Sequence, residues 1–167
     1  MSDQTWQGRS ESVDDTARIG RAIARCTRAG DVVALIGALG AGKTQLVRGM
    51  AVELGVDADQ VASPTYVLIH EYATGADRPV LVHIDAYRIS DAADLESIGW
   101  EPGGGELAEN AIVVIEWADR LADDLGPDAL EVTLEHASPT ERLVTMRPVG
   151  AWTERMKQLV PEVETGA

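Results

Sequence analysis

Residues 37–44 constrain the fold of this chain more than any other segment. They read GALGAGKT and fit the phosphate-binding P-loop pattern G-x-x-x-x-G-K-[ST] at every required position. Residues 31–36 before them predict a short buried strand, and residues 44–54 after them predict a helix with one apolar side. A strand, a glycine loop and a helix start point several backbone N–H groups at one place, which suits the phosphates of a nucleotide. Lys43 would reach the β- and γ-phosphates and the Thr44 hydroxyl would ligate Mg²⁺. The alternative is a glycine-rich turn that matches by chance, and the two flanks argue against it.

Length and composition fit one α/β domain rather than a membrane or nucleic-acid-binding protein. The chain has 167 residues, 45% of them hydrophobic, and no apolar run long enough to span a bilayer. Its polar N-terminus does not resemble a signal peptide, and its single cysteine, Cys26, cannot form an internal disulfide, which suits the cytoplasm. With a net charge of −14 and scattered basic residues, we expect no direct grip on DNA or RNA. Any RNA in its pathway would be held by a partner.

The hydrophobic pattern predicts a single P-loop NTPase-like domain over residues 12–150. We expect a central, mostly parallel or mixed sheet flanked by helices, with a C-terminal hairpin. Residues 1–11 and 151–167 are expected to be terminal segments that are partly mobile, although the second could form one helix. Residues 102–105 are expected to form a flexible loop. The predicted helices cover residues 15–28, 44–54 and 91–97, the first capped by Ser12 or Asp14, and the predicted extended segments cover residues 31–36, 61–72, 80–85, 111–116, 130–136 and 142–147.

Two carboxylates are candidates to complete a site beside the glycine loop. Asp85 and Glu116 each follow an apolar strand, so both would emerge at the carboxyl edge of a parallel sheet, where α/β proteins bind ligands. From the pattern alone, either one could hold the metal while the other orients water. Tyr87 and Trp117 lie just beyond them and could cover a nucleotide or simply pack at the sheet edge. The three histidines, His70, His83 and His136, lack metal-ligand spacing and are interpreted as structural.

Four motifs together resemble one known family. The P-loop is followed by Ser63-Pro64-Thr65-Tyr66, by His83-Ile84-Asp85-Ala86-Tyr87-Arg88 and by Ile115-Glu116-Trp117-Ala118. Their order and spacing are similar to those of TsaE, a bacterial P-loop ATPase required for making N6-threonylcarbamoyladenosine on tRNA. The resemblance spans residues 14–147. Each motif alone is weak, but the last three combined with the P-loop are specific.

The resemblance implies a role for each matching position. Asp85, Glu116 and Lys43 would be catalytic: Asp85 would position or activate the attacking water, while Glu116 and Thr44 would ligate Mg²⁺. Thr65 would lie in a switch-like loop near the γ-phosphate. The residues implied to bind ATP are Gly37, Leu39, Gly40, Ala41, Gly42, Lys43, Thr44, Gln45, Thr65, Trp117, Arg142 and Asp14, the last from a segment that lies near the adenine.

Two positions in the loop depart from the family pattern. The family often has Asp where this chain has Ala38, and a second Thr where it has Gln45. Ala38 removes a carboxylate that does not contact phosphate in the general P-loop mechanism. Gln45 lacks the hydroxyl that could reach the α-phosphate, so that contact is left open. Neither change touches Lys43 or Thr44.

The resemblance implies an ATP-binding and hydrolysing subunit of the tRNA modification pathway. It would act as a nucleotide-dependent switch on the complex of TsaD and TsaB, with tRNA contacted only through that complex. Two other functions remain open: a P-loop small-molecule kinase, and a nucleotide-dependent interaction module without significant turnover. A kinase would need an acceptor pocket and an arginine-bearing lid, and the sequence offers no clear arginine-rich insertion.

Overall fold

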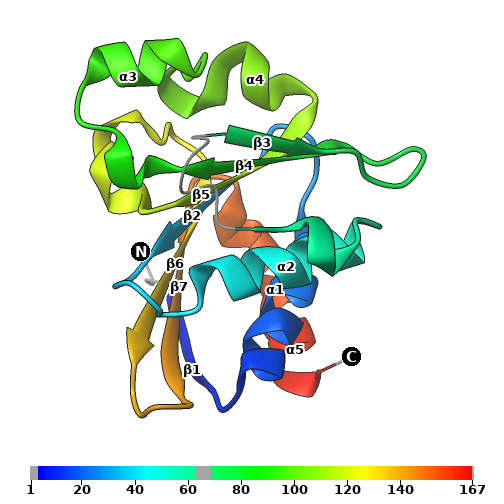
Figure 1. Cartoon of the computed structure of the whole chain (residues 1–167). Coiled ribbons are helices and arrows are strands. Elements are labelled where there is room, and N and C mark those ends of the chain that lie inside the picture. Colours follow the sequence, from blue (N-terminus) through cyan, green and yellow to red (C-terminus); the bar gives the residue numbers. More distant parts are fainter. Residues whose placement is uncertain (1–3, 63–68, 167) are drawn as a thin grey trace.

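The computed structural model describes residues 4–62 and 69–166, which form an α/β fold around one twisted sheet (Figure 1). The strands are β1 (Trp6–Ser10), β2 (Val32–Ile36), β3 (Ile69–Tyr72), β4 (Val80–Asp85), β5 (Ala111–Glu116), β6 (Ala129–His136) and β7 (Arg142–Val149). The α-helices are α1 (Val13–Cys26), α2 (Lys43–Glu53), α3 (Ala92–Ser97), α4 (Gly105–Glu109) and α5 (Trp152–Thr165). Short 3₁₀ segments are η1 (Ala58–Gln60), η2 (Ala86–Arg88), η3 (Pro102–Gly104) and η4 (Ala118–Asp124).

The sheet has its parallel strands in the middle and antiparallel strands at both edges. Its order is β1-β7-β6-β2-β5-β4-β3. β2 pairs in parallel with both β5 and β6, and β5 pairs in parallel with β4. β6 and β7 form the predicted C-terminal hairpin, to which β1 adds antiparallel. The predicted mixed α/β sheet with flanking helices is therefore confirmed, and the strand that leads into the glycine loop is central.

Both faces of the sheet are covered, which explains the continuous apolar runs in β2 and in the first five residues of β5. α1, α2 and α5 pack on one face, where alternate residues of β2, β5 and β6 join their core. The segments after β4 and β5 cover the other face, with Trp100, Leu121 and Leu125 buried among the remaining strand residues. All six residues of β5 are buried. This burial leaves the loops at the carboxyl edge as the place for polar function.

α1 and α2 approach each other closely because two glycines lie at their contact. A Cβ added to Gly49 would stand 2.0 Å from the carbonyl oxygen of Ala17. A Cβ added to Gly20 would stand 2.1 Å from the carbonyl oxygen of Leu46. The backbones therefore touch where side chains normally separate helices. This contact fixes the position of α2, whose first turn carries Lys43 and Thr44.

The N-terminal segment contains a strand that the sequence did not predict. Residues 1–11 show no hydrophobic periodicity and are predicted to be a partly mobile terminal segment, but Trp6–Ser10 form β1 at the edge of the sheet. An edge strand pairs through backbone groups on one side only, so it needs little apolar pattern. Ser12, one of the two expected caps, begins α1 by accepting a hydrogen bond from the backbone N–H of Asp15.

One other segment differs in detail from the expectation, and a second takes one of the alternatives that the sequence left open. Residues 102–105, expected to form a flexible loop, make the 3₁₀ segment Pro102–Gly104 and the start of α4. The positive φ angles of Gly103 and Gly104, +78° and +94°, allow this compact turn where the glycine run suggested an open loop. The C-terminal segment takes the helical alternative as α5, with Trp152 and Leu159 buried against the core.

Candidate functional site

The predicted phosphate-binding loop lies between β2 and α2 with three glycines at positive φ. The angles are +154° at Gly37, +74° at Gly40 and +105° at Gly42. At Gly37 a side chain is excluded as well, because a Cβ would lie 2.5 Å from the carbonyl oxygen of Leu134 in β6. Gly42 is the N-cap of α2, and the structure shows no side-chain hydrogen bond at that cap. The first N–H groups of an eleven-residue helix therefore lack a side-chain cap, as an anion site requires.

Lys43 is buried at the first position of α2, with 4% of its surface exposed. Its Nζ donates hydrogen bonds to the carbonyl oxygens of Gly37, at 2.5 Å, and Ala38, at 2.9 Å. It also lies 3.8 Å from the centre of the Trp117 ring, a cation–π contact. Burial lowers the pKa of Lys43, and the charges of Glu116 and Asp85 oppose that shift. The ammonium group is thus held at the loop by carbonyls and an aromatic face.

Glu116 ends β5 directly across from Thr44. The Thr44 hydroxyl donates a hydrogen bond to Oε1 of Glu116 at 2.7 Å. His83 Nε2 lies 3.0 Å from the same oxygen, and the His83 and Glu116 side chains are 0% and 4% exposed. The parallel register of β4 and β5 pairs Asp85 with Glu116, so both strands end at one edge. The two candidate carboxylates therefore meet as the sequence predicted.

Asp85 and the two aromatic residues form the wall opposite the loop. Asp85 is buried, and its Oδ1 accepts a hydrogen bond from the backbone N–H of Tyr87 at 2.9 Å. The Tyr87 and Trp117 rings lie 5.0 Å apart at a tilt of 56°. Trp117 has a φ of +58°, a conformation that non-glycine residues rarely adopt. Such strain is typical of positions where a side chain must face a site.

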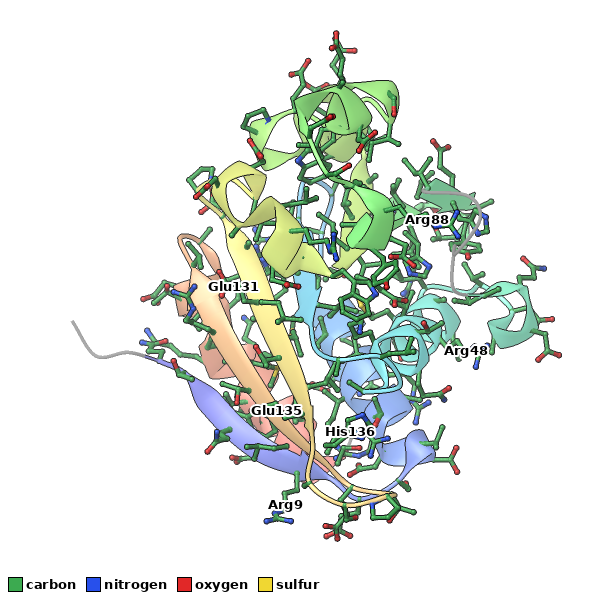
Figure 2. The ribbon with its side chains drawn as sticks, turned by 60° about the vertical axis from the view of Figure 1, so that its left-hand side comes forward. Arg9, Arg48, Arg88, Glu131, Glu135 and His136 are labelled. Carbon is green, nitrogen blue, oxygen red and sulfur yellow. The ribbon has the colours of Figure 1, made fainter. Side chains whose placement is uncertain are left out.

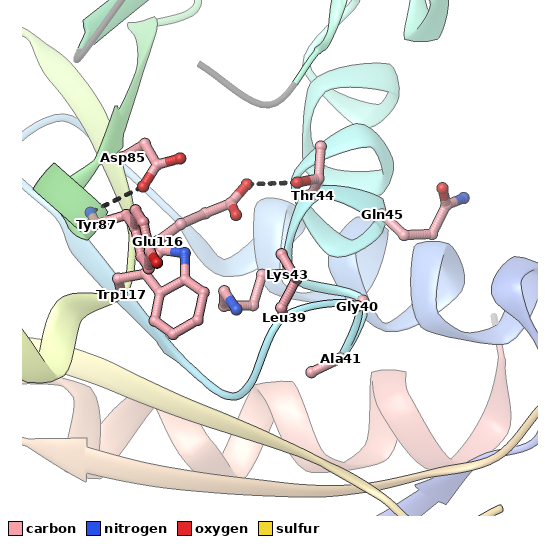
Figure 3. A pocket seen from close by; sticks show the side chains of 11 residues that line it. Leu39, Gly40, Ala41, Lys43, Thr44, Gln45, Asp85, Tyr87, Glu116 and Trp117 are labelled. Atoms are coloured by element: carbon pink, nitrogen blue, oxygen red, sulfur yellow. Dashed lines mark hydrogen bonds between the residues drawn. The ribbon is translucent and has the colours of Figure 1, made fainter. Parts of the chain in front are cut away.

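These groups surround a cavity of about 520 Å³ (Figure 3). Figure 3 shows Asp85, Glu116 and Trp117 on one side and the loop and α2 on the other. The lining residues are Leu39, Gly40, Ala41, Gly42, Lys43, Thr44, Gln45, Asp85, Tyr87, Glu116 and Trp117. The lining contains one cationic side chain and two carboxylates. This arrangement can bind a phosphate group together with a metal ion.

Two residues implied by the resemblance, Arg142 and Asp14, are not among the residues that line this cavity. The Arg142 guanidinium donates to the carbonyl oxygens of Ala41, at 3.0 Å, and Gly40, at 3.2 Å, so it holds the outer side of the loop. Asp14 is exposed in the first turn of α1. A second cavity of about 110 Å³ lies on this side of the loop, lined by Ser12, Val13, Thr16, Gly40, Gly42, Gln45, Thr140 and Arg142. Gln45 borders both cavities.

The remaining residues singled out in the sequence analysis are Gly37, Thr65 and His83. Gly37 lies at the base of the loop, where its carbonyl receives Lys43. Thr65 and the rest of its motif lie outside the described residues. His83, interpreted from the sequence as structural, contacts Glu116. The signal that could have found it is strand alternation, because residues 83 and 85 of one strand lie on the same face.

Comparison with known proteins identifies the family. A family profile described as "Threonylcarbamoyl adenosine biosynthesis protein TsaE" matches residues 10–144, which is most of the chain. The chain belongs to the TsaE family. A TsaE protein of Mycobacterium leprae is 42% identical over 129 residues, covering 75% of this chain and 79% of the relative. One from Bacillus subtilis is 34% identical over 150 residues, covering 90% and 89%.

A solved structure shares the TsaE fold described above. The crystal structure of YdiB from Bacillus subtilis superposes with a TM-score of 0.71 at 27% sequence identity. The match covers 96% of this chain and 95% of that one. The overall fold is therefore shared with a solved structure.

The arginines labelled in Figure 2 are dispersed, in agreement with the acidic composition of the chain. Figure 2 shows Arg9, Arg48 and Arg88 on separate parts of the molecule, from β1, α2 and η2. Among the described residues no helix is long and apolar enough to cross a membrane. The same residues hold no cluster of three or more His, Cys, Asp or Glu side chains suited to a metal.

Proposed function

We propose that this TsaE-family protein binds and hydrolyses ATP in the cytoplasm to support threonylcarbamoyladenosine formation on tRNA. The observation that carries the ATPase part is the contact between the Thr44 hydroxyl and the Glu116 carboxylate beside the cavity of about 520 Å³. It joins the helix after the glycine loop to the end of the neighbouring strand. The tRNA part rests on the family, whose described role is threonylcarbamoyladenosine biosynthesis.

The loop and Lys43 would bind the phosphates of ATP. The uncapped N–H groups at the start of α2 supply hydrogen-bond donors, and Lys43 supplies the positive charge. Its Nζ now donates to two loop carbonyls, so phosphate oxygens would compete with Gly37 and Ala38 for it. Trp117, whose ring lies tilted against that of Tyr87, would cover the phosphates and exclude water. The smaller cavity beyond the loop extends the site toward Ser12 and Thr16.

The donor set fits Mg²⁺. This ion prefers oxygen ligands and is usually held by one or two side chains together with substrate phosphates and water. Thr44 and Glu116 provide a hydroxyl and a carboxylate within 2.7 Å of each other, which is a suitable pair. A bound Mg²⁺ would neutralise charge on the β- and γ-phosphate oxygens. The sparse protein ligation agrees with an ion that arrives with its nucleotide.

Asp85 would orient the water that attacks the γ-phosphate. Its carboxylate lines the cavity, and the Tyr87 backbone N–H holds one of its oxygens. The other edge of the site is closed by Lys43 and Trp117 at 3.8 Å. Catalysis of phosphoryl transfer depends on positioning and charge stabilisation more than on covalent chemistry. A site with one positioned carboxylate and few other groups predicts slow turnover by the protein alone.

We further propose that ATP acts as a switch on the partner complex of TsaD and TsaB. The net charge of −14 and the dispersed arginines argue against direct binding of tRNA. Protein partners would then carry the RNA, and this chain would respond to ATP or ADP. Thr65 is proposed to take part in that response, on the resemblance alone.

The test is ATP hydrolysis by the purified protein, alone and with TsaD, TsaB and tRNA. We expect slow hydrolysis alone and faster hydrolysis with the partners. A rate indifferent to the partners would keep the ATPase and refute the switch. Phosphate transfer from ATP to a metabolite would favour the kinase alternative. Partner binding that requires ATP, without measurable hydrolysis, would favour an interaction module.

A further inference from the structure

His83 is a buried polar side chain for which the proposed ATPase mechanism has no use so far. It lies in β4 with 0% of its surface exposed. One ring nitrogen, Nε2, lies 3.0 Å from Glu116 Oε1. The other, Nδ1, is buried and has no hydrogen-bond partner among the described residues. Because buried polar groups are normally hydrogen-bonded, the contact with Glu116 is the interaction that could give His83 a role.

The ring's surroundings decide which nitrogen carries its proton. A neutral imidazole has one N–H donor and one acceptor nitrogen. A carboxylate oxygen accepts and cannot donate, so the Nε2–H form makes a hydrogen bond with Glu116. The opposite form would bury an unpaired N–H at Nδ1 and face two acceptors toward each other. His83 therefore donates from Nε2 to Glu116.

Both donors to Glu116 use the same oxygen. The Thr44 hydroxyl and the His83 ring reach Oε1 at 2.7 and 3.0 Å, from α2 and β4. Among the described residues, no hydrogen bond reaches Oε2. A glutamate side chain has three rotatable bonds, and two donors from separate elements fix its carboxylate plane. The second oxygen is then presented in a defined direction at the end of β5.

We propose that His83 is a positioning residue that holds the Glu116 carboxylate in the orientation needed to bind Mg²⁺ with ATP. The inference rests on the proposed function, because it concerns the same metal site. Side chains that hydrogen-bond a metal ligand typically change metal affinity 10- to 100-fold when removed. His83 acts only through Glu116, so it is not itself a ligand or a catalytic group. Lys43 and the loop are independent of it and keep their hold on phosphate.

Two variants separate positioning from packing. His83→Leu removes the donor while filling a similar space, and His83→Gln places an amide N–H near the position of Nε2. The control is His70→Leu, since His70 pairs with His83 across β3 and β4 but its ring contacts Tyr72 instead. The probe is Mn²⁺, with free ion measured by electron paramagnetic resonance in the presence of ADP. ADP binding in EDTA is measured in parallel.

We expect His83→Leu to weaken Mn²⁺ binding about 10-fold or more. His83→Gln and His70→Leu should stay within about three-fold of the unaltered protein, and ADP binding in EDTA should not change. Equal Mn²⁺ affinity in His83→Leu would overturn the inference, and so would an equal loss in His83→Gln and His83→Leu. If the unaltered protein bound neither ADP nor Mn²⁺ with ADP, the proposed function would fail instead.

A second measurement keeps the inference testable if His83→Leu does not fold. Nitrogen-15 chemical shifts of the histidine rings in the nucleotide-free protein report which ring nitrogen carries the proton. We expect a proton on Nε2 of His83, the nitrogen that faces Glu116. A proton on Nδ1 alone would contradict the hydrogen bond to Glu116 and reject the positioning role, whatever the ATPase measurements show.

Discussion

Lys43 holds its charge in a place where water is scarce. Its burial lowers its pKa, while Glu116, Asp85 and Asp119 favour the protonated form. The two loop carbonyls and the Trp117 ring replace part of the lost hydration. Phosphate oxygens carry full negative charge, so they are stronger acceptors for Nζ than the carbonyls. The lysine is therefore already positioned for a ligand before one binds.

Replacement of Lys43 by alanine should abolish ATP binding. Among the described residues, the only cationic side chain that lines the cavity of about 520 Å³ is lost, and charge-assisted hydrogen bonds contribute about 1.5–3 kcal/mol each. We expect a loss of affinity of roughly 100-fold or more, measured by calorimetric titration with ATP and Mg²⁺. Lys157→Ala is the control, because Lys157 lies exposed on α5. Unaltered affinity in Lys43→Ala would place the nucleotide elsewhere.

Replacement of Asp85 by alanine should separate binding from turnover. Its carboxylate lines the wall opposite the loop and accepts a hydrogen bond from the Tyr87 backbone N–H. In the proposed mechanism it orients water and does not bind phosphate. We expect ATP affinity within a few-fold of the unaltered protein and a fall in hydrolysis of about 100-fold or more, as for loss of a positioned general base. Single-turnover hydrolysis with excess protein is the measurement. A fully active variant would remove Asp85 from the mechanism.

At the scale of elements, the position of α2 depends on its contact with α1. Gly49 lies against the Ala17 carbonyl with no room for a Cβ, so the two helix backbones touch. Because α2 begins at Lys43, a shift of this helix moves Lys43 and Thr44 relative to Glu116. The packing of α1 against α2 therefore helps to set the geometry of the candidate site.

Replacement of Gly49 by alanine should destabilise the protein by overpacking. The new methyl group would overlap backbone atoms of α1, and such insertions cost about 1–3 kcal/mol. The free energy of unfolding is measured by urea titration. Gly75→Ala is the control, since its nearest neighbour, the Leu54 carbonyl oxygen, stands 3.8 Å from the added Cβ. Equal stability of the two variants would show that α1 and α2 can separate without cost.

Elements with strong apolar runs were predictable, and weakly patterned ones were not. β2 and β5 are buried on both faces, so their sequences are continuous apolar runs that identify them. β1 has an alternating burial pattern with only Trp6 as a large apolar residue, and its place comes from backbone pairing with β7. α4 is a single short turn after a glycine run. Local sequence carries little information about either.

The candidate site was predictable in part for the same reason. Asp85 and Glu116 follow strong strands, so their meeting at one edge follows from parallel pairing. His83 was missed because its partner is 33 residues away, in another strand. Arg142 was expected to touch a nucleotide, and its hydrogen bonds to Gly40 and Ala41 depend on the fold of the hairpin. Such contacts exist only in three dimensions.

At the scale of the whole molecule, a buried ion pair ties the last helix to the central strand. Arg155 of α5 donates to both carboxylate oxygens of Asp31, at 2.5 and 2.6 Å, just before β2. The two side chains are 9% and 8% exposed. The guanidinium also lies 4.0 Å from the centre of the Trp152 ring. α5 is therefore joined to the core at the end of the sheet opposite the candidate site.

Replacement of Arg155 by methionine should cost about 3–5 kcal/mol of folding free energy. Methionine fills space, but it leaves the Asp31 carboxylate buried without its cation. Thermal and urea unfolding are the measurements. Arg147→Met is the control: Arg147 is 56% exposed and pairs with Glu131 across the β6–β7 hairpin, and surface ion pairs contribute about 0–1 kcal/mol. A similar small loss in both variants would show that the buried pair is not needed for folding.

The pairing of β2 with β5 has one more consequence. Leu35 and Glu116 are register partners in these parallel strands. Leu35 lies two residues before Gly37, and Glu116 is the last residue of β5. A slip of one residue would turn Glu116 to the opposite face, away from Thr44. The apolar side chains that prevent this slip lie in the core and touch no ligand. The placement of Glu116 relative to Thr44 therefore depends on the packing of the hydrophobic core. Selection for a tightly packed core is then also selection for an aligned site.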